Sequence, residues 1–278
     1  MMSEELSKFE KTVLKEINKL NLNEYEIKNL LKQASRPEKV RKTYDHFYGS
    51  RSAKVGVIAD THIGSKFFNE ELFMNAVKTF NREKVDAIYH CGDVIEGMSN
   101  RDGHIYELKT LGVSAQMKEA SEVLSELRQP LYFITGNHDE WSAKKSNQGV
   151  MVGPTLESMI KDSKFLGEYY ADVKLAPNVT MRLTHDGNSA YALSYSGQKK
   201  INGLSGGDKP EIIANGHLHK ALHMFYRNIQ YVEAATFQEQ TPFMKMKGSP
   251  AMPGYYVFDI GYNKRGINKF NAKLFPGY

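Results

Sequence analysis

Residues 54–60, KVGVIAD, form a short apolar run, rich in β-branched side chains, that ends in an acid. Four later stretches share this form, since each apolar run ends in Asp, His or Asn close to Gly: DAIYHCGD (86–93), PLYFITGNHD (130–139), VTMRLTHDG (179–187) and EIIANGHLH (211–219). Helix-like stretches lie between some of them, such as residues 69–84 and 114–127. Buried strands that alternate with amphipathic helices predict a layered α/β domain.

The polar residues at the ends of these runs are of the metal-binding kind. In open α/β sheets, functional groups gather just past the carboxyl ends of the strands, so we expect these residues to converge. They are Asp60, His62, Asp93, Asn137, His138, Asp139, His185, His217 and His219. Carboxylates, imidazoles and an amide oxygen suit Mn, Fe, Zn or Co. A single catalytic metal takes about three protein ligands. The larger set therefore predicts two metals that share one bridging carboxylate.

Composition narrows the class of protein. Of 278 residues, 41% are hydrophobic and 25% are charged, which is typical of a globular protein and excludes a collagen-like or wholly disordered chain. The single cysteine, Cys91, excludes an internal disulfide and a thiolate metal site. The start, MMSEELSKFEK, lacks the apolar region of a signal peptide, and no run approaches the ~20 apolar residues of a membrane span. We expect a cytoplasmic protein without membrane contact.

The first fifty residues differ from the rest. Apolar residues recur at three- and four-residue steps from Leu6 to Leu20, which lines one face of a helix. Asn23 is suited to cap a second helix that Pro37 ends, and residues 38–48 could form a third. We predict a helical extension, residues 1–50, that is either helix-turn-helix-like or a dimerisation unit. The domain proper is then residues 51–278.

The five motifs together resemble the calcineurin-like metallophosphoesterase superfamily, whose pattern is D-x-H, G-D, G-N-H-[DE], H and G-H-x-H. They stand in that order here as ADTHIG (59–64), CGDVIEG (91–97), TGNHDEW (135–141), LTHDG (183–187) and NGHLHK (215–220). Asp186 is a departure, because the family more often has Gly directly after this His. The resemblance runs from about Lys54 to the C-terminus and implies a four-layer αββα sandwich. The sequence also looks like phage and archaeal phosphoesterases described as DNA-repair-type exonucleases.

The resemblance implies a role for each motif residue. Asp60, His62 and His219 would hold one metal, Asn137, His185 and His217 the other, and Asp93 would bridge them. The implied cofactors are two divalent ions, with Mn²⁺ favoured and Fe, Zn, Co or Ni as alternatives, that activate water for attack on phosphorus. His138 would stabilise the transition state or protonate the leaving oxygen, and Asp139 could orient its ring.

Basic stretches favour nucleic acid as the substrate. The net charge is +5, and seven cations stand between Lys28 and Arg51 against Glu38 and Asp45. They are Lys28, Lys32, Arg36, Lys39, Arg41, Lys42 and Arg51. Such a face could track phosphates, and it could equally be a solvated helix surface. Further residues that could contact substrate are Arg101, His104, Trp141, Lys199 and Lys200.

The favoured function is therefore a two-metal phosphodiesterase acting as a DNA or RNA nuclease. One alternative is a small-molecule phosphodiesterase or a phosphoprotein phosphatase of the same superfamily. Phosphatases usually carry several Arg residues that clamp phosphate, and Arg101 is the one suitable Arg between these motifs. Another alternative is a non-catalytic binding subunit. A homodimer formed through the N-terminal helices also stays open.

Overall fold

A computed structural model describes residues 43–144, 150–187 and 192–277. The contacts divide the chain into Met1–Arg41 and Lys42–Tyr278, and the described residues belong to the second unit. The expected helices of residues 1–42, and with them most of the basic stretch that begins at Lys28, lie outside the described residues.

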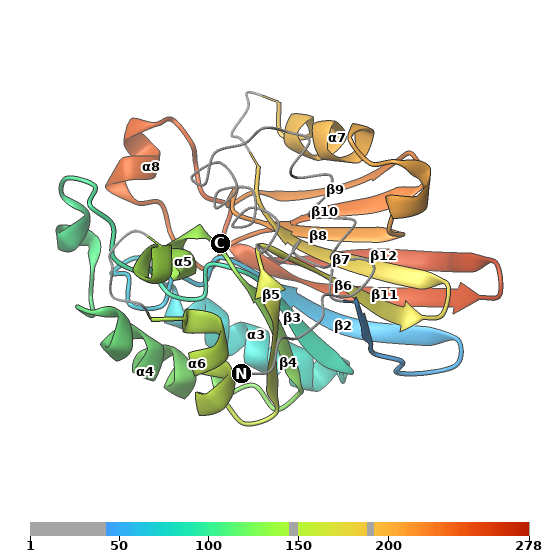
Figure 1. Cartoon of the computed structure of the whole chain (residues 1–278), viewed down its shortest axis with the longest axis horizontal. Coiled ribbons are helices and arrows are strands. Elements are labelled where there is room, and N and C mark those ends of the chain that lie inside the picture. Colours follow the sequence, from blue (N-terminus) through green and yellow to red (C-terminus); the bar gives the residue numbers. More distant parts are fainter. Residues whose placement is uncertain (1–42, 145–149, 188–191, 278) are drawn as a thin grey trace, which may run out of the picture. The chain divides into compact units, whose positions relative to one another are not determined.

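Two six-stranded sheets form the centre of the domain (Figure 1). The first sheet has the order β1 (Thr43–Asp45), β6 (Tyr170–Ala176), β7 (Val179–His185), β8 (Ile212–Gly216), β10 (Ile229–Ala234) and β9 (Ala221–Tyr226). The second has the order β12 (Gly266–Pro276), β11 (Gly254–Asn263), β2 (Ser52–Ile58), β3 (Ala87–Cys91), β4 (Leu131–Thr135) and β5 (Ser163–Glu168).

Helices cover the outer faces of both sheets, as Figure 1 shows. Phe73, Met117 and Leu156 come from the helices α3 (Glu70–Glu83), α4 (Val113–Leu124) and α6 (Val152–Met159), and they share a buried cluster with residues of the second sheet. Ile201 of α7 (Tyr195–Asn202) packs with Ile213, Ile229 and Tyr231 of the first sheet. The two sheets bury a third cluster between them, which includes Val57, Tyr89 and Leu183. This is the expected four-layer αββα sandwich. The remaining helices are η1 (His104–Glu107), α5 (Asn137–Lys144), η2 (Gly206–Asp208) and α8 (Pro242–Met246).

The strand directions bring the polar motifs together. Strands β2, β3 and β4 run parallel, and β7 runs parallel to β8. Asp60 and Asp93 each follow the last residue of their strand by two positions, and Asn137 opens α5 directly after β4 and Gly136. His185 is the last residue of β7, and His217 follows β8. The carboxyl ends of these strands, from both sheets, therefore present these side chains at one edge of the sandwich.

The prediction for residues 38–48 was wrong where the structure describes them. Thr43–Asp45 is a strand, β1, that pairs in parallel with β6, and no helix follows it up to β2. The hydroxyl of Tyr44 donates to the carbonyl of Leu166, and Tyr48 hydrogen-bonds to Tyr89 at 2.7 Å. The residues of this segment therefore pair and bond with the sheet. The tertiary contacts of the sheet outweigh the weak local pattern that indicated a helix. None of the described helices is long and apolar enough to cross a membrane.

Candidate metal centre

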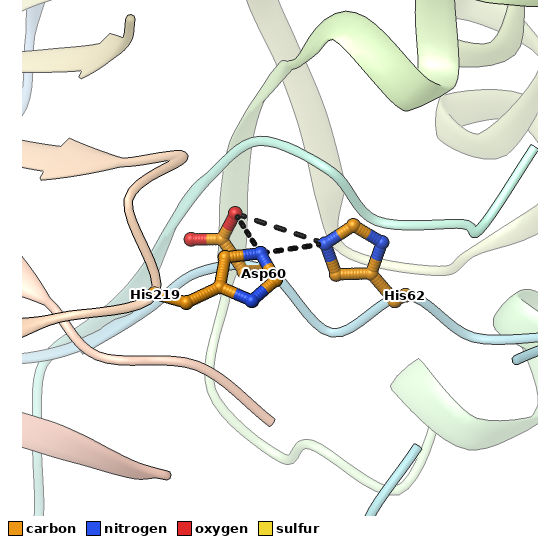
Figure 2. Close-up of side chains that lie close together, drawn as sticks. All are labelled: Asp60, His62 and His219. Carbon is orange, nitrogen blue, oxygen red and sulfur yellow. Dashed lines mark hydrogen bonds and ion pairs between the residues drawn. The ribbon is translucent and has the colours of Figure 1, made fainter. Parts of the chain in front are cut away.

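The seven residues expected to bind metal converge, six of them in two groups and the seventh, Asp93, between these groups. Asp60, His62 and His219 form the first group, in which Nε2 of His62 lies 3.0 Å from Nε2 of His219 (Figure 2). Oδ1 of Asp60 lies 3.3 Å from Nε2 of His219 and 3.9 Å from Nε2 of His62. All three side chains point their donor atoms at one small space, as Figure 2 shows.

The second group contains Asn137, His185 and His217. Oδ1 of Asn137 is 2.8 Å from Nδ1 of His217 and 3.2 Å from Nε2 of His185. The other ring nitrogen of His185, Nδ1, is 2.7 Å from the carbonyl of Cys91, which leaves Nε2 to face the group. The pairing of one ring nitrogen with a carbonyl is the usual way in which a protein fixes the orientation of a metal-binding imidazole.

Asp93 lies between the two groups. Its Oδ2 is 3.0 Å from Nε2 of His185 and 3.7 Å from Nε2 of His62. Its Oδ1 accepts a hydrogen bond from the backbone N–H of His138 at 2.8 Å. A carboxylate has two oxygens and can bind two ions, so Asp93 is placed as a bridging ligand would be.

The backbone of this site is strained. Asp60, His62, Asp93, His217 and His219 have φ angles of 51°, 47°, 54°, 85° and 53°, in the left-handed region that side chains other than Gly rarely adopt. Such a residue costs roughly 1–3 kcal/mol and persists only where the surrounding structure enforces it. At Asp60 the surrounding structure includes the backbone N–H of His217, which donates to both carboxylate oxygens at 3.0 Å. The strain aims five donor side chains inward.

In the metal-free protein, ion pairs determine which side chains of the site are protonated. Burial alone would lower the pKa of His185, but Asp93 outweighs it and raises that pKa to about 9. Burial likewise opposes protonation of His62, and Glu96 raises its pKa to about 9. For Asp93 the order is reversed, because burial would raise its pKa and His185 and His138 hold it well below the usual range. The metal-free site therefore holds protons where cations would bind.

The donor set fits divalent ions. All seven residues offer N or O atoms, and the thiol of Cys91 belongs to none of the donor groups that the described residues form. Burial raises the pKa of this thiol. Nδ1 of His62 and Nδ1 of His219 are buried and have no hydrogen-bond partner. Nδ1 of His62 is 3.0 Å from Oε2 of Glu96, but the two atoms are not aligned for a hydrogen bond. These Nδ1 atoms lie across their rings from the Nε2 atoms, and a cation would bind at Nε2, where the two imidazoles and the buried carboxylates of Asp60 and Asp93 converge with separations of 3.0–3.9 Å.

Glu96 is central to the site, although no role was predicted for it. Its side chain is 2% exposed and its oxygens lie 2.8 Å from Nε2 of His104 and 2.6 Å from Nε2 of Gln238. Its backbone carbonyl is 2.8 Å from Nδ1 of His138. An acid three positions after Asp93 in CGDVIEG was a visible signal. Gln238, in TFQEQTPF (236–243), belongs to none of the five metal motifs.

His138 and Asp139 are placed differently from each other. The carbonyl of Glu96 orients the His138 ring, the role that had been expected of Asp139. Asp139 instead accepts from the backbone N–H groups of Val94, Ile95 and Gly136 at 2.9–3.1 Å, and so supports the loop that carries Asp93. Burial lowers the pKa of His138 to about 4, so its ring is neutral near pH 7 in the metal-free protein.

A cavity of about 1160 Å³ opens over the site. His62, Asp93, Asn137, His138, His217 and His219 line it, together with Arg101 and Trp141 from the expected substrate contacts. The ring of Trp141 lies 3.8 Å from that of His138 between centroids. The structure thus places Arg101 and Trp141 at the wall of the cavity.

The other three expected contacts lie elsewhere. His104 is 1% exposed and bonded to Glu96, so it is part of the interior and not of a solvated loop. Nζ of Lys200 is bound to Thr184 at 2.8 Å, to Asn215 at 2.6 Å and to Asp186, which keeps it beneath the ends of β7 and β8. Lys199 is exposed on α7 and does not line the cavity.

A two-sheet sandwich with carboxylates and imidazoles at its strand ends defines a class of metal-dependent phosphoesterases. The family model of calcineurin-like phosphoesterases matches residues 53–221, more than half of the chain, and the protein belongs to this family.

Sequence relatives include two archaeal proteins named DNA polymerase II small subunit. The one from Methanothermobacter thermautotrophicus is 23% identical over 238 residues, which cover 69% of this chain and 49% of that protein. The one from Halobacterium salinarum is 22% identical over 274 residues, which cover 84% of this chain and 53% of that protein. The chain spans about half the length of these relatives.

Similar solved structures include an archaeal phosphodiesterase and the phosphoesterase Yfce from E. coli. The first is 15% identical with a TM-score of 0.45, and the match covers 80% of this chain and 99% of that one. The second is 17% identical with a TM-score of 0.43, and the match covers 79% and 98%.

Proposed function

We propose that the protein hydrolyses phosphodiester bonds in DNA or RNA at a two-metal centre. The observation that carries this proposal is the position of Asp93, whose Oδ2 reaches His185 of one group at 3.0 Å and His62 of the other at 3.7 Å. A single carboxylate between two complete donor groups is what two adjacent ions require. Oxygen and imidazole donors suit Mn, Fe, Zn and Co alike, and Mn²⁺, which the family resemblance favours, is the ion with which we test the proposal.

Two divalent ions held there would supply a hydroxide at neutral pH and Lewis-acid contact to the phosphoryl oxygens. The protein's own residues do the rest. Asp93 and Asp60 hold negative charge that balances the cations, and His138 presents Nε2 to the cavity because Nδ1 is bonded to the Glu96 carbonyl. A neutral His138 accepts a proton from solvent at Nε2 when an anionic substrate raises its pKa, and it donates that proton to the leaving oxygen as the bond between phosphorus and that oxygen breaks.

The position of Arg101 supports diesters over monoesters. Its guanidinium makes two hydrogen bonds to the carboxylate of Glu107, at 2.7 and 3.2 Å. The carboxylate of Glu107 balances the charge of Arg101, which weakens its attraction for the dianionic end of a phosphomonoester. The cavity is also wide enough for a polymer segment, and relatives of this chain are named as DNA polymerase subunits. These points together support nucleic acid as the substrate.

Turnover assays with Mn²⁺ decide the proposal. We expect cleavage of labelled DNA or RNA, and faster turnover of a bis-aryl than of a mono-aryl phosphate. Asp93→Asn, purified in the same way, is the control that excludes a contaminating nuclease. Turnover of the aryl diester without any cleavage of nucleic acid would favour a small-molecule phosphodiesterase. Binding of DNA without turnover of any substrate would favour the non-catalytic subunit.

A further inference from the structure

We propose that the cavity contains a stacking subsite for an unpaired nucleobase, formed by Phe243 with Arg101. This inference rests on the proposed function and narrows its substrate class to single-stranded nucleic acid. The same cavity is lined by the metal-site residues His62 and Asp93 and by Phe243. A strand whose phosphate reaches the metal centre therefore has this aromatic ring within the same enclosed space.

The backbone of Phe243 is anchored to the domain, but its ring is partly exposed. It lies in the first turn of α8, a helix that begins with Pro242 and is capped by Thr241, whose Oγ1 accepts from the backbone N–H of Met244 at 3.1 Å. Thr241 is buried, which fixes the helix to the domain. The Phe243 side chain is nevertheless 37% exposed, and it belongs to none of the buried clusters of the described residues. A large ring anchored by its backbone and exposed to a cavity is available to a ligand.

Arg101 adds a flat cation to this ring. Its guanidinium carbon lies 4.4 Å from the centroid of the Phe243 ring, within the range of a cation–π contact. The two hydrogen bonds to Glu107, itself 8% exposed, fix the plane of the guanidinium and balance its charge. Nζ of Lys247 lies 5.8 Å from the same centroid. The guanidinium thus lies over one face of the ring, so an incoming base would stack on the opposite face of Phe243 or on the outer face of Arg101, with Lys247 as a further cation nearby.

This chemistry matches a nucleobase with a phosphate beside it. Every base has a π-face that stacks on aromatic rings and on guanidinium planes, and Lys247 can attract a neighbouring phosphate. The phosphate ester of a serine or of a lipid has no comparable π-face. Within a duplex, both faces of a base are covered by its neighbours, so the base must be unpaired and unstacked to reach Phe243. The subsite thus selects single strands.

Binding measurements test the subsite without depending on catalysis. A short fluorescent thymidine oligonucleotide is titrated in chelator and followed by anisotropy, beside an abasic oligonucleotide of the same length. We expect Phe243→Leu to weaken binding of the thymidine strand about tenfold, in line with the usual contribution of a stacked base, and Phe243→Tyr to retain it. The abasic strand should bind wild type and Phe243→Leu equally. Met246→Ala, on the same helix but outside the cavity, is the matched control and should bind as wild type does.

Equal binding of the thymidine strand by wild type and Phe243→Leu would overturn the subsite, as would an equal loss for the abasic strand. Thymidine monophosphate as a competitor separates a strand from a free nucleotide, and displacement at a lower concentration than the oligonucleotide requires would overturn the strand assignment. Melting curves confirm that each variant is folded. The proposed hydrolysis is judged separately, by turnover of the aryl diester by wild type, so either proposal can fail alone.

Discussion

Oδ2 of Asp93 lies 3.0 Å from Nε2 of His185, and each side chain holds the other in its charged form. Both side chains are almost fully buried, so removing either one would leave the other as an unpaired buried charge, which is costly. The pair links β3 of one sheet to β7 of the other at the edge where the motifs meet. It is the contact on which the metal centre depends most directly.

Asp93→Asn should abolish turnover and remove at least one of the two bound ions. The amide is nearly the same size, but it removes the one carboxylate shared by the two donor groups and lowers the pKa of His185. Metal content of the purified protein, measured by mass spectrometry, should fall from two ions to one or none. Asp259→Asn changes an acid that pairs with Lys269 on β12, away from the site, and should leave metal content unchanged. Two ions retained in Asp93→Asn would contradict the bridging role.

The metal-free protein should lose stability between about pH 6.5 and pH 9.5. The pKa values of His62 and His185 are raised to about 9 in the folded chain, against about 6.5 when unfolded, so protonation favours folding. That contribution is complete below the unfolded pKa and is lost as pH rises through the folded pKa. In chelator, the melting temperature should fall by at least about 4 °C over this range.

Saturation with Mn²⁺ should remove this loss, because ions bind deprotonated imidazoles and release their protons. Metal affinity should accordingly rise with pH over the same interval, and titration in weakly buffered solution should show proton release. A metal-free protein that is more stable at pH 9.5 than at pH 6.5 would show that the two histidines are neutral in the folded chain.

Gly136→Ala should weaken metal binding although it adds only a methyl group. A Cβ at Gly136 would lie 2.5 Å from Nε2 of His185 and would also collide with Oδ1 of Asp93. One of these donors must move, and the expected loss of metal affinity is at least about tenfold. Gly206→Ala is the matched control, since a Cβ there meets nothing within 4 Å. Calorimetric titration with Mn²⁺ compares the two, and equal affinities would mean that the site accommodates the methyl group.

Local patterns in the sequence predicted a layered α/β domain and the convergence of the polar residues, whereas the four-layer sandwich and the assignment of the seven donors came from the family resemblance. Apolar runs predict buried strands, and parallel strands carry the residues that follow them to one edge. The short segment at Thr43–Asp45 was missed, because its strand depends on pairing with β6, far away in the chain.

The sequence did not allow prediction of which side chains outside the metal motifs are buried and which line the cavity. His104 and Lys200 are ordinary polar residues in the sequence, and their positions depend on Glu96 in one case and on Thr184 and Asn215 in the other. Phe243 lies outside the five metal motifs, and its place in the cavity depends on α8 and on the Arg101 loop meeting over the site. The left-handed backbone at Asp60 and Asp93 likewise results from tertiary hydrogen bonds.

Glu96→Gln should lower metal affinity by about 10- to 100-fold while the fold is kept. Glu96 is the main group that raises the pKa of His62, and its carboxylate also binds His104 and Gln238. The amide can keep one of these hydrogen bonds, but it lacks the charge that makes His62 a stronger ligand. A structural role alone would lower the melting temperature without changing the pH at which metal binds. The pH midpoint of Mn²⁺ binding should instead shift downward, since His62 then loses its proton more readily, while the affinity at high pH falls. Glu157→Gln, on the surface of α6, should change neither quantity, and an unshifted midpoint in Glu96→Gln would show that Glu96 does not act through His62.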